Sequence, residues 1–181
     1  MRLTAITTLF LLCALPAAAQ SADAIQKSLK TQASTIQAWG SDKELVAAVR
    51  AQNARKIPMA EIEKIDKGWV AGGEQALVKQ LTTGPCADRL RTLIASHPSF
   101  GETMLIDNQG ALVCASQKTS DYYQGDESKW QRSFDAGKGA VFIDRPRFDA
   151  SAVENLAQIS VPVVDAGHVI GVLTVGVDIK R

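Results

Sequence analysis

The sequence lacks an excess of charge of either sign. Its 181 residues hold 20 lysines and arginines against 19 aspartates and glutamates, a formal net charge of +1. It also lacks a basic run or stripe, which a protein needs in order to bind the phosphate backbone of nucleic acids. We therefore expect no nucleic-acid partner and no strong attraction to an anionic membrane surface.

Long apolar runs are missing beyond the N-terminus. A membrane-spanning helix needs about 20 mostly apolar residues, and no segment after residue 20 approaches that length. At the N-terminus, Arg2 precedes an apolar stretch from Leu3 to Leu15, and Ala17-Ala18-Ala19 offers small residues for cleavage. This is the layout of a secretory signal peptide, with an uncleaved anchor as the alternative. We expect residues 1–19 to be removed and residues 20–181 to form one periplasmic domain.

Motifs of the common catalytic and cofactor sites are absent. The sequence has no Gly-x-Ser-x-Gly elbow, no His-Glu-x-x-His pair, no phosphate-binding glycine loop and no closely spaced cysteine pair. His97 precedes a proline and His168 lies in a predicted turn, so neither is placed like a general base. We expect no enzyme activity and no cofactor.

Acidic residues are few in any one place. Asp121, Asp126 and Glu127 could coordinate a cation or a ligand amine, but they lack the repeated spacing of an EF-hand loop. Their alternative role is to begin a helix, where carboxylates cap backbone amides. We therefore expect no metal site here.

Cysteine is scarce as well. Cys13 falls within the signal segment, which leaves Cys86 and Cys114 in the mature chain. Export to an oxidising compartment and an even count favour a disulfide between them. Such a bridge would stabilise the fold by about 3 kcal/mol in the chain-entropy picture. The alternative is two buried free thiols, one in a helix and one in a strand.

The first half of the mature chain has helical periodicity. Ile25, Leu29 and Ile36 recur at helical spacing and predict one long amphipathic helix. Ser41-Asp42-Lys43-Glu44 has the spacing of a capping box and predicts the start of a second helix. Three further helical segments are predicted, one opened by Pro58 and running to Trp69, one around Leu77 to Leu81, and one around Leu90 to Ile94.

From residue 102 the periodicity becomes that of strands. Short apolar runs at 103–107 and 111–116 flank Asn108-Gln109-Gly110, which suits a hairpin turn. A polar loop (117–127) and a short helix (128–135) follow, and three more strands are predicted at 140–143, 155–164 and 169–179. Helices followed by strands indicate an α+β domain with an antiparallel sheet of five strands.

The last two predicted strands alternate most clearly. In the first of them, Ile159, Val161 and Val163 alternate with Gln158, Ser160 and Pro162. Successive side chains of a strand lie on opposite faces of the sheet. One face can therefore pack on the helices, while the other presents Gln158, Ser160 and Thr174 to a ligand.

The order of these motifs resembles one family. Four segments carry the resemblance: Asp107-Asn108-Gln109-Gly110, Thr119 to Trp130, Ile159 to Val163 and Gly171 to Val177. Over about residues 22–181 the chain resembles the Cache (PAS-like, PDC) family of extracytoplasmic sensor domains. The resemblance implies a long N-terminal helix laid against a five-stranded antiparallel sheet. It also implies a small-molecule pocket on the opposite face, roofed by the loop and short helix between the second and third strands.

The resemblance further implies a ligand class and a partner. Members of the family usually sense amino acids, carboxylates, amines or similar metabolites. Most lie between two membrane helices of a chemoreceptor, a histidine kinase or a cyclase. The sequence stops at Lys180-Arg181, where a second membrane helix would begin. We therefore expect a periplasmic binding and sensing module that acts through a separate membrane partner of one of these kinds.

Candidate ligand contacts come first from the aromatic loop. Tyr122, Tyr123 and Trp130 each offer a flat ring for contact and a polar edge that fixes orientation. For Trp130, a place in the hydrophobic core of the short helix is an equal alternative.

Further candidates follow the third strand. By the resemblance, the loop there rims the pocket, so Arg145 could bind a carboxylate in bidentate fashion and Asp149 could receive an ammonium group. Gln158 and Ser160 would add hydrogen bonds from the sheet. A structural alternative uses no ligand: the long helices would pair into a homodimer through an apolar stripe on residues 22–55, with the pocket closed.

Overall fold

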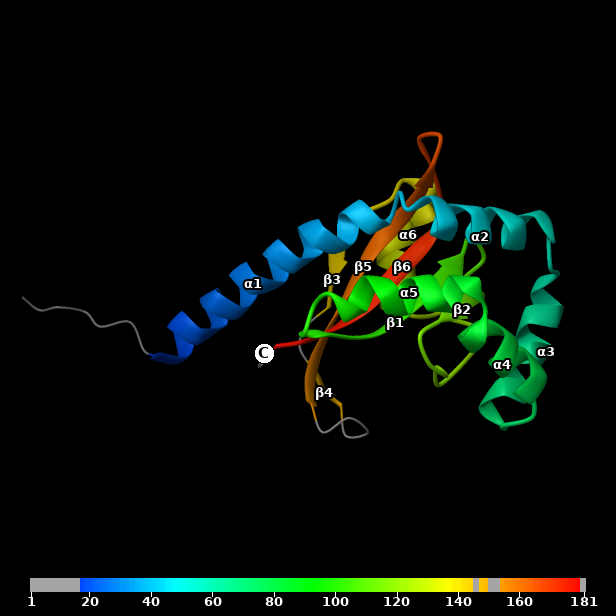
Figure 1. Ribbon diagram of the computed structural model, residues 1–181, viewed down its shortest axis with the longest axis horizontal. Helices are drawn as coiled ribbons and strands as arrows, with labels where there is room; N and C mark the ends of the chain where they lie inside the picture. Colours follow the sequence, from blue (N-terminus) through cyan, green and yellow to red (C-terminus); the bar gives the residue numbers. More distant parts are fainter. Residues whose placement is uncertain (1–16, 145–146, 150–153, 180–181) are drawn as a thin grey trace, which may run out of the picture.

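Five helices precede most of the sheet in the computed structural model, which describes residues 17–144, 147–149 and 154–179 (Figure 1). The helices are α1 (Ala17–Trp39), α2 (Lys43–Ala54), α3 (Met59–Val70), α4 (Gln75–Thr83) and α5 (Pro85–Ala95). They are followed by β1 (Phe100–Asp107), β2 (Leu112–Ala115), α6 (Ser128–Phe134), the 3₁₀ turn η1 (Asp135–Gly137), β3 (Phe142–Ile143), β4 (Arg147–Asp149), β5 (Glu154–Asp165) and β6 (His168–Asp178). The predicted α+β class is confirmed.

The strands form one antiparallel sheet in the order β2-β1-β6-β5-β3, and β4 also pairs with β5. The five predicted strands are all present, and β4 is an addition that the sequence did not predict. The long β5–β6 hairpin forms the centre, with Ser160 opposite Thr174 and Val161 opposite Leu173. Ala166 and Gly167 at its turn both have positive φ, as a type I′ turn requires.

One face of the sheet, here called the helical face, is covered by α1, α2 and α5. In Figure 1, α5 crosses in front of the strands and α6 lies behind them. The hydrophobic core on the helical face includes Leu29, Ile36, Leu45, Val49, Leu90, Leu105, Ile159, Val161, Leu173 and Val175. Within the stripe expected on residues 22–55, Leu29, Ile36, Leu45 and Val49 are thus buried inside the domain, while pairing of the helices into a homodimer stays a prediction.

The opposite face, here called the loop face, is covered by α6, by the loop 117–127 and, at one end of the sheet, by α3 and α4. Its apolar cluster includes Ile62, Trp69, Leu81, Met104, Ile106, Leu112, Tyr122 and Val172. Trp130 and Phe134 of α6 pack against this cluster. The ligand pocket implied by the resemblance would lie on this face.

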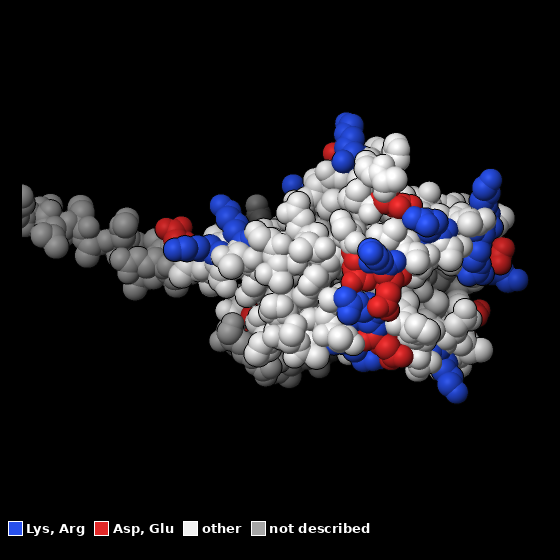
Figure 2. Space-filling model, turned by 45° about the horizontal axis from the view of Figure 1, so that its top comes forward, with Lys and Arg blue, Asp and Glu red and all other residues white. Residues whose placement is uncertain are grey.

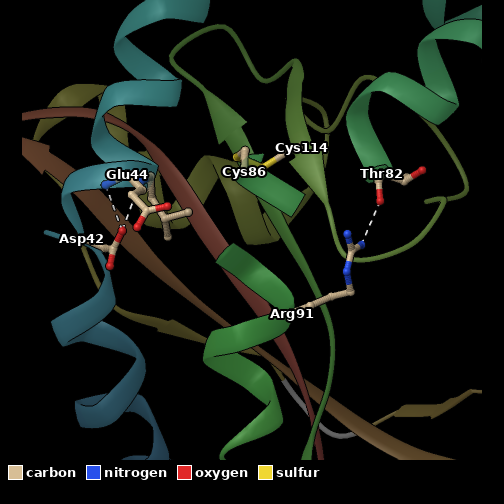
Figure 3. Close-up of a disulfide and its surroundings, with 7 residues drawn as sticks. Asp42, Glu44, Thr82, Cys86, Arg91 and Cys114 are labelled. Atoms are coloured by element: carbon tan, nitrogen blue, oxygen red, sulfur yellow. Dashed lines mark hydrogen bonds between the residues drawn. A yellow bond between two sulfur atoms is a disulfide. The ribbon is translucent and has the colours of Figure 1, made fainter. Parts of the chain in front are cut away.

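Two local features of the helical side fix its framework. A disulfide joins Cys86 of α5 to Cys114 of β2, with their Cα atoms 6.1 Å apart and a sequence separation of 28 (Figure 3). The N-cap of α2 is Asp42 rather than Ser41, because the Asp42 carboxylate accepts hydrogen bonds from the amides of Glu44 and Leu45 at 3.0 and 3.2 Å. Both features tie helices to the positions that the sheet requires.

The N-terminal prediction falls mostly outside the described residues. The signal peptide was predicted at residues 1–19, and α1 is described from Ala17 onward. Cleavage therefore stays a prediction. Within the described part of the chain, no helix combines the length and the apolar character needed to cross a membrane.

Candidate functional site

The loop 117–127 is joined to the start of β2. The amide of Leu112 donates to the carbonyl of Tyr122 at 3.1 Å, and the amide of Gln124 donates to the carbonyl of Gly110 at 2.7 Å. Gly110 has φ +90°, and a Cβ there would lie 2.3 Å from the Cα of Gly125. Only glycine fits this close approach of two backbones. The loop therefore lies against the β1–β2 turn in a defined position.

Helix α3 holds the same loop from the other side. One carboxylate oxygen of Asp66 accepts hydrogen bonds from the amides of Tyr122 and Tyr123, at 2.8 and 2.9 Å. The indole N–H of Trp69, which is fully buried, donates to the carbonyl of Thr119 at 2.9 Å. These three bonds join residues 50 to 57 positions apart in sequence, so the conformation of the loop depends on α3.

The three aromatic residues predicted as ligand contacts have different surroundings. Tyr122 is only 2% exposed and its ring centroid lies 6.0 Å from that of Trp69, so it is a core residue. Trp130 donates its indole N–H to the carbonyl of Asp107 at 2.9 Å, and it stacks on Phe134 at 4.9 Å between centroids. Trp130 thus makes the core contacts that were its alternative.

Tyr123 is only partly buried, unlike Tyr122. Its ring lies against Gly125, where a Cβ would come within 2.6 Å of the ring. Of the three rings, that of Tyr123 is the one whose surroundings leave it most open to a further contact.

Two hydroxyl groups meet on the sheet beneath α6. The Ser160 Oγ and Thr174 Oγ1 atoms lie 2.8 Å apart, and both residues are buried. Phe142 of β3 lies opposite Ser160 on its other side, and Gln158, two residues earlier on β5, is half-buried. The alternation of β5 therefore places Gln158 and Ser160 on the side away from the hydrophobic cluster of the helical face, as predicted. Thr174 joins them there.

A second polar group lies in the loop. Gln124 is 0% exposed, and its side-chain amide N–H donates to the backbone carbonyl of Asp121 at 2.9 Å and to the Asp121 carboxylate. Because both of these partners are acceptors, the amide nitrogen must face them and the orientation of Gln124 is fixed. Its Oε1 atom has no hydrogen-bond partner among the described residues. A buried acceptor in this state can accept a bond from a donor.

The third polar group lies at the start of α6. Lys129 is 6% exposed, and its Nζ lies 2.8 Å from the Glu127 Oε2 atom. Glu127 precedes α6 as its N-cap, yet its side chain makes no capping bond. The capping role considered for Asp126 and Glu127 is thus not what the Glu127 carboxylate does, since it pairs with Lys129 instead.

These polar residues influence one another electrostatically. Burial raises the pKa of Asp121, and the nearby Glu127 carboxylate raises it further, while Lys129 acts in the opposite direction. Asp121, Gln124, Glu127 and Lys129 therefore form one group, here called the loop polar cluster. The sequence pointed to Asp121 and Glu127 but not to Gln124 or Lys129, because no periodicity marks a polar residue as buried.

Two predicted contacts cannot be placed in the same way. Arg145 lies outside the described residues. Asp149 ends β4, where its backbone is paired opposite Glu154 of β5, and its side chain is not described. Both stay predictions. In the residues that are described, no group of three or more His, Cys, Asp or Glu side chains is arranged to hold a metal ion.

A hollow lies elsewhere, between the start of α2 and the β5–β6 turn. Its volume is about 360 Å³, and its lining is Ser41, Lys43, Val46, Ala47, Arg50, Val164 and Asp165. The Arg50 and Asp165 side chains pair across it at 2.6 Å. The surface shown in Figure 2 carries interspersed basic and acidic side chains, with no large patch of one sign.

Comparison with known proteins finds similarity only in structure. No family model matches the chain, and no curated protein matches it. The sensor domain of the V. cholerae histidine kinase DctB is similar with TM-score 0.48 and 14% identity, over 89% of this chain and 54% of that one. The ligand-binding domain of the Pseudomonas aeruginosa amino acid chemoreceptor PctC, in complex with GABA, is similar with TM-score 0.44 and 18% identity, over 70% of this chain and 60% of that one.

A third similar structure is the ligand-binding domain of the Campylobacter jejuni chemoreceptor Tlp3 in complex with 4-methylisoleucine, with TM-score 0.40 and 16% identity, over 85% of this chain and 60% of that one. The chain thus spans little more than half the length of these domains. Sensor domains of histidine kinases and chemoreceptors are what the chain is similar to, as the sequence predicted. At TM-scores below 0.5 this likeness carries no argument about ligand or partner.

Proposed function

We propose that the chain is a periplasmic sensor module that binds a small polar metabolite on the loop face, between α6 and the β5–β6 hairpin. The ligand is an amino acid, a carboxylate or an amine. The bound state is read by a separate membrane protein, a chemoreceptor, a histidine kinase or a cyclase. The signal peptide is removed on export, and no catalytic step is assigned to the domain.

One observation carries the proposal: buried polar groups collect on the loop face. Burying a polar group without a partner costs free energy, so folded proteins seldom do so without a reason. Here the Ser160–Thr174 hydroxyl pair lies on the sheet, and the Oε1 of Gln124, in the loop 117–127, has no hydrogen-bond partner among the described residues. Ligand pockets combine apolar walls with a few such polar groups.

The predicted contacts divide by role under this proposal. Tyr123, Gln158 and Ser160 contact the ligand, and Thr174 joins them. Tyr122 and Trp130 hold the wall and the roof in place rather than touching the ligand. Arg145 and Asp149, on the loop after β3 and on β4, bind the charged ends of the ligand.

A thermal-shift screen tests the proposal. The purified mature domain is heated with amino acids, carboxylates and polyamines in turn, because a ligand that binds the native state raises the melting temperature. The expected result is a rise with a subset of these compounds. That rise should fall away in the Ser160→Ala, Thr174→Val double variant. It should persist in Thr82→Val, a control in α4 whose hydroxyl bonds only within its own helix.

A flat response of the wild-type domain across the whole panel contradicts ligand binding. A response that the double variant retains in full contradicts the placement of the ligand on the loop face. Near-ultraviolet circular dichroism of each variant shows whether its fold is intact.

A further inference from the structure

Lys129 is the most unusual charge on the loop face. Lysine is almost never fully buried unless it is paired, because an ammonium group loses its hydration on burial. Lys129 lies one turn before Ser133 on the buried side of α6, and Ser133 is fully buried. Its ammonium group therefore needs a negative partner inside the domain.

The Glu127 carboxylate, which pairs with Lys129 at 2.8 Å, is more exposed than the ammonium group. The Glu127 side chain is 38% exposed while that of Lys129 is 7% exposed, so one end of the pair is buried and the other reaches solvent. Glu127 is two residues from Lys129 and, apart from this pair, makes no capping bond to the helix. The carboxylate can therefore turn into water at small cost, provided that another anion takes its place on Lys129.

The neighbours of the pair suit a ligand with both an acid and a donor group. Asp121 lies within electrostatic reach of Glu127 and Lys129, and it holds the side-chain amide of Gln124. The Oε1 of Gln124 is buried and unpartnered among the described residues. A carboxylate on Lys129 with an N–H or O–H group for Gln124 would satisfy both.

We propose that Glu127 is a built-in counter-ion for Lys129, which the carboxylate of the bound ligand replaces. This inference rests on the proposed binding function and narrows its ligand to compounds that carry a carboxylate. Binding then exchanges one buried ion pair for another and releases the Glu127 carboxylate to solvent. The exchange makes the affinity for the ligand weaker than Lys129 alone would give, since the ligand must compete with Glu127.

Calorimetric titration of matched probes tests the exchange. The probes are acetate, succinate and glutarate, with acetamide, succinamide and glutaramide as their uncharged counterparts. Each is titrated into the wild-type domain, Glu127→Gln, Lys129→Met and the control Asp88→Asn. The control loses a carboxylate from the ion pair with Arg91, whose two side chains are 39% and 66% exposed.

We expect the affinity for carboxylates to rise in one variant and to be lost in another. Glu127→Gln should bind the tightest carboxylate about tenfold more tightly than the wild type, because a charged hydrogen bond no longer has to be broken first. Lys129→Met should lose this binding, and Asp88→Asn should match the wild type. The uncharged amides should bind all four proteins alike.

An unchanged carboxylate affinity in Glu127→Gln, or full retention of binding in Lys129→Met, overturns the proposal. So does the failure of every carboxylate to bind both the wild type and Glu127→Gln. In that last case the proposed sensing function still stands if an amine or a neutral compound raises the melting temperature. The proposed sensing function fails as well only if no compound of the thermal-shift panel raises the melting temperature.

A measurement on the unmodified protein covers the case in which a variant does not fold. The carbon-13 resonance of the Glu127 carboxyl group is followed as the tightest carboxylate is added to the wild-type domain. Release to solvent should move this resonance to the position of exposed glutamates such as Glu44. A resonance that stays in place at saturation contradicts the exchange.

Discussion

The two faces of the sheet differ in the kinds of side chain that they bury. On the helical face, α1, α2 and α5 meet a large cluster of buried apolar residues. On the loop face, the apolar cluster is interrupted by buried polar residues, among them Gln124, Lys129, Ser160 and Thr174. Burial of apolar area is the main source of stability, and burial of polar groups reduces it. The helical face thus supplies the stability that allows the loop face to bury polar groups.

The carboxylates also differ from one another in how burial acts on their pKa. Burial alone would raise the pKa of Asp42, but the hydrogen bonds from Arg89 and from the amides of α2 outweigh it, and the pKa is lowered. For Asp107 and Asp121, burial prevails and the pKa is raised. Asp42 therefore stabilises the folded state when ionised, while ionisation of Asp107 and Asp121 opposes folding.

The largest expected effect on the free energy of unfolding comes from Leu173, which faces the helical side. It contrasts with the effect of Thr174, the next residue of β6, which faces the loop side. Leu173→Ala on the helical face should lower the free energy of unfolding by about 3 kcal/mol, because the side chain is fully buried in the cluster. The Ser160→Ala, Thr174→Val double variant on the loop face should change it by less than about 1 kcal/mol, since both hydroxyls are removed together. Urea denaturation measures both. Equal losses would remove the distinction between the faces.

The disulfide should have an effect of similar size. Replacing Cys86 and Cys114 together by alanine opens a loop of 28 residues, which should lower the free energy of unfolding by about 3 kcal/mol. The bridge is part of the framework of the helical side, so the rise in melting temperature caused by a ligand should stay the same. Thermal unfolding with and without the ligand measures both quantities. A lost ligand response in a folded variant would contradict the separation of roles.

Loss of the Asp66 carboxylate, which holds the loop 117–127 to α3, should have the next largest effect on the free energy of unfolding. Asp66→Ala leaves the amides of Tyr122 and Tyr123 without their shared acceptor, at a cost of about 2 kcal/mol. Hydrogen exchange should show faster exchange of these two amides and no change in the amides of α1 and α5. Asp88→Ala, which removes an exposed carboxylate from α5, serves as the control. Unchanged protection at Tyr122 and Tyr123 would show that the loop needs no support from α3.

The smallest effect is the dependence of stability on pH. Because the pKa of Asp107 is raised above its ordinary value of 3.8, the folded state binds more protons than the unfolded state between 3.8 and the raised pKa. Stability from this residue therefore falls as pH rises through that range. Because the pKa of Asp42 is lowered, its contribution is present above 3.8 and is lost as pH falls through the lowered pKa. Carbon-13 titration should find Asp107 above and Asp42 below 3.8.

The periodicity of apolar residues predicted the helices and strands well, because the residues that pack in the core of the helical face recur at that periodicity. The spacing of Ile25, Leu29 and Ile36 predicted α1, and the alternation of residues 158–163 predicted which side chains of β5 face the helices. The three-residue strand β4 escaped prediction because it is too short to alternate. Its position depends on pairing with β5 rather than on its own sequence.

The candidate site was harder to predict because its contacts join distant segments. The loop takes its position from Asp66 and Trp69 of α3, and this pairing leaves no pattern in the sequence. Tyr122 appeared to be a ligand contact because tyrosine suits binding sites, yet its neighbours bury it. Nothing in the sequence marks Lys129 as buried, and only the fold shows that it lies buried beside Glu127.

The most direct test of ligand binding on the loop face is methyl NMR of the wild-type domain at saturation with the tightest ligand of the thermal-shift panel. The account predicts shift changes at Met104, Ile106 and Val172, whose side chains belong to the loop-face cluster. It predicts no change at Leu29, Leu45 and Leu173 of the helical face. Changes confined to the helical face, or to Val46 and Val164 beside the hollow at the start of α2, would contradict it.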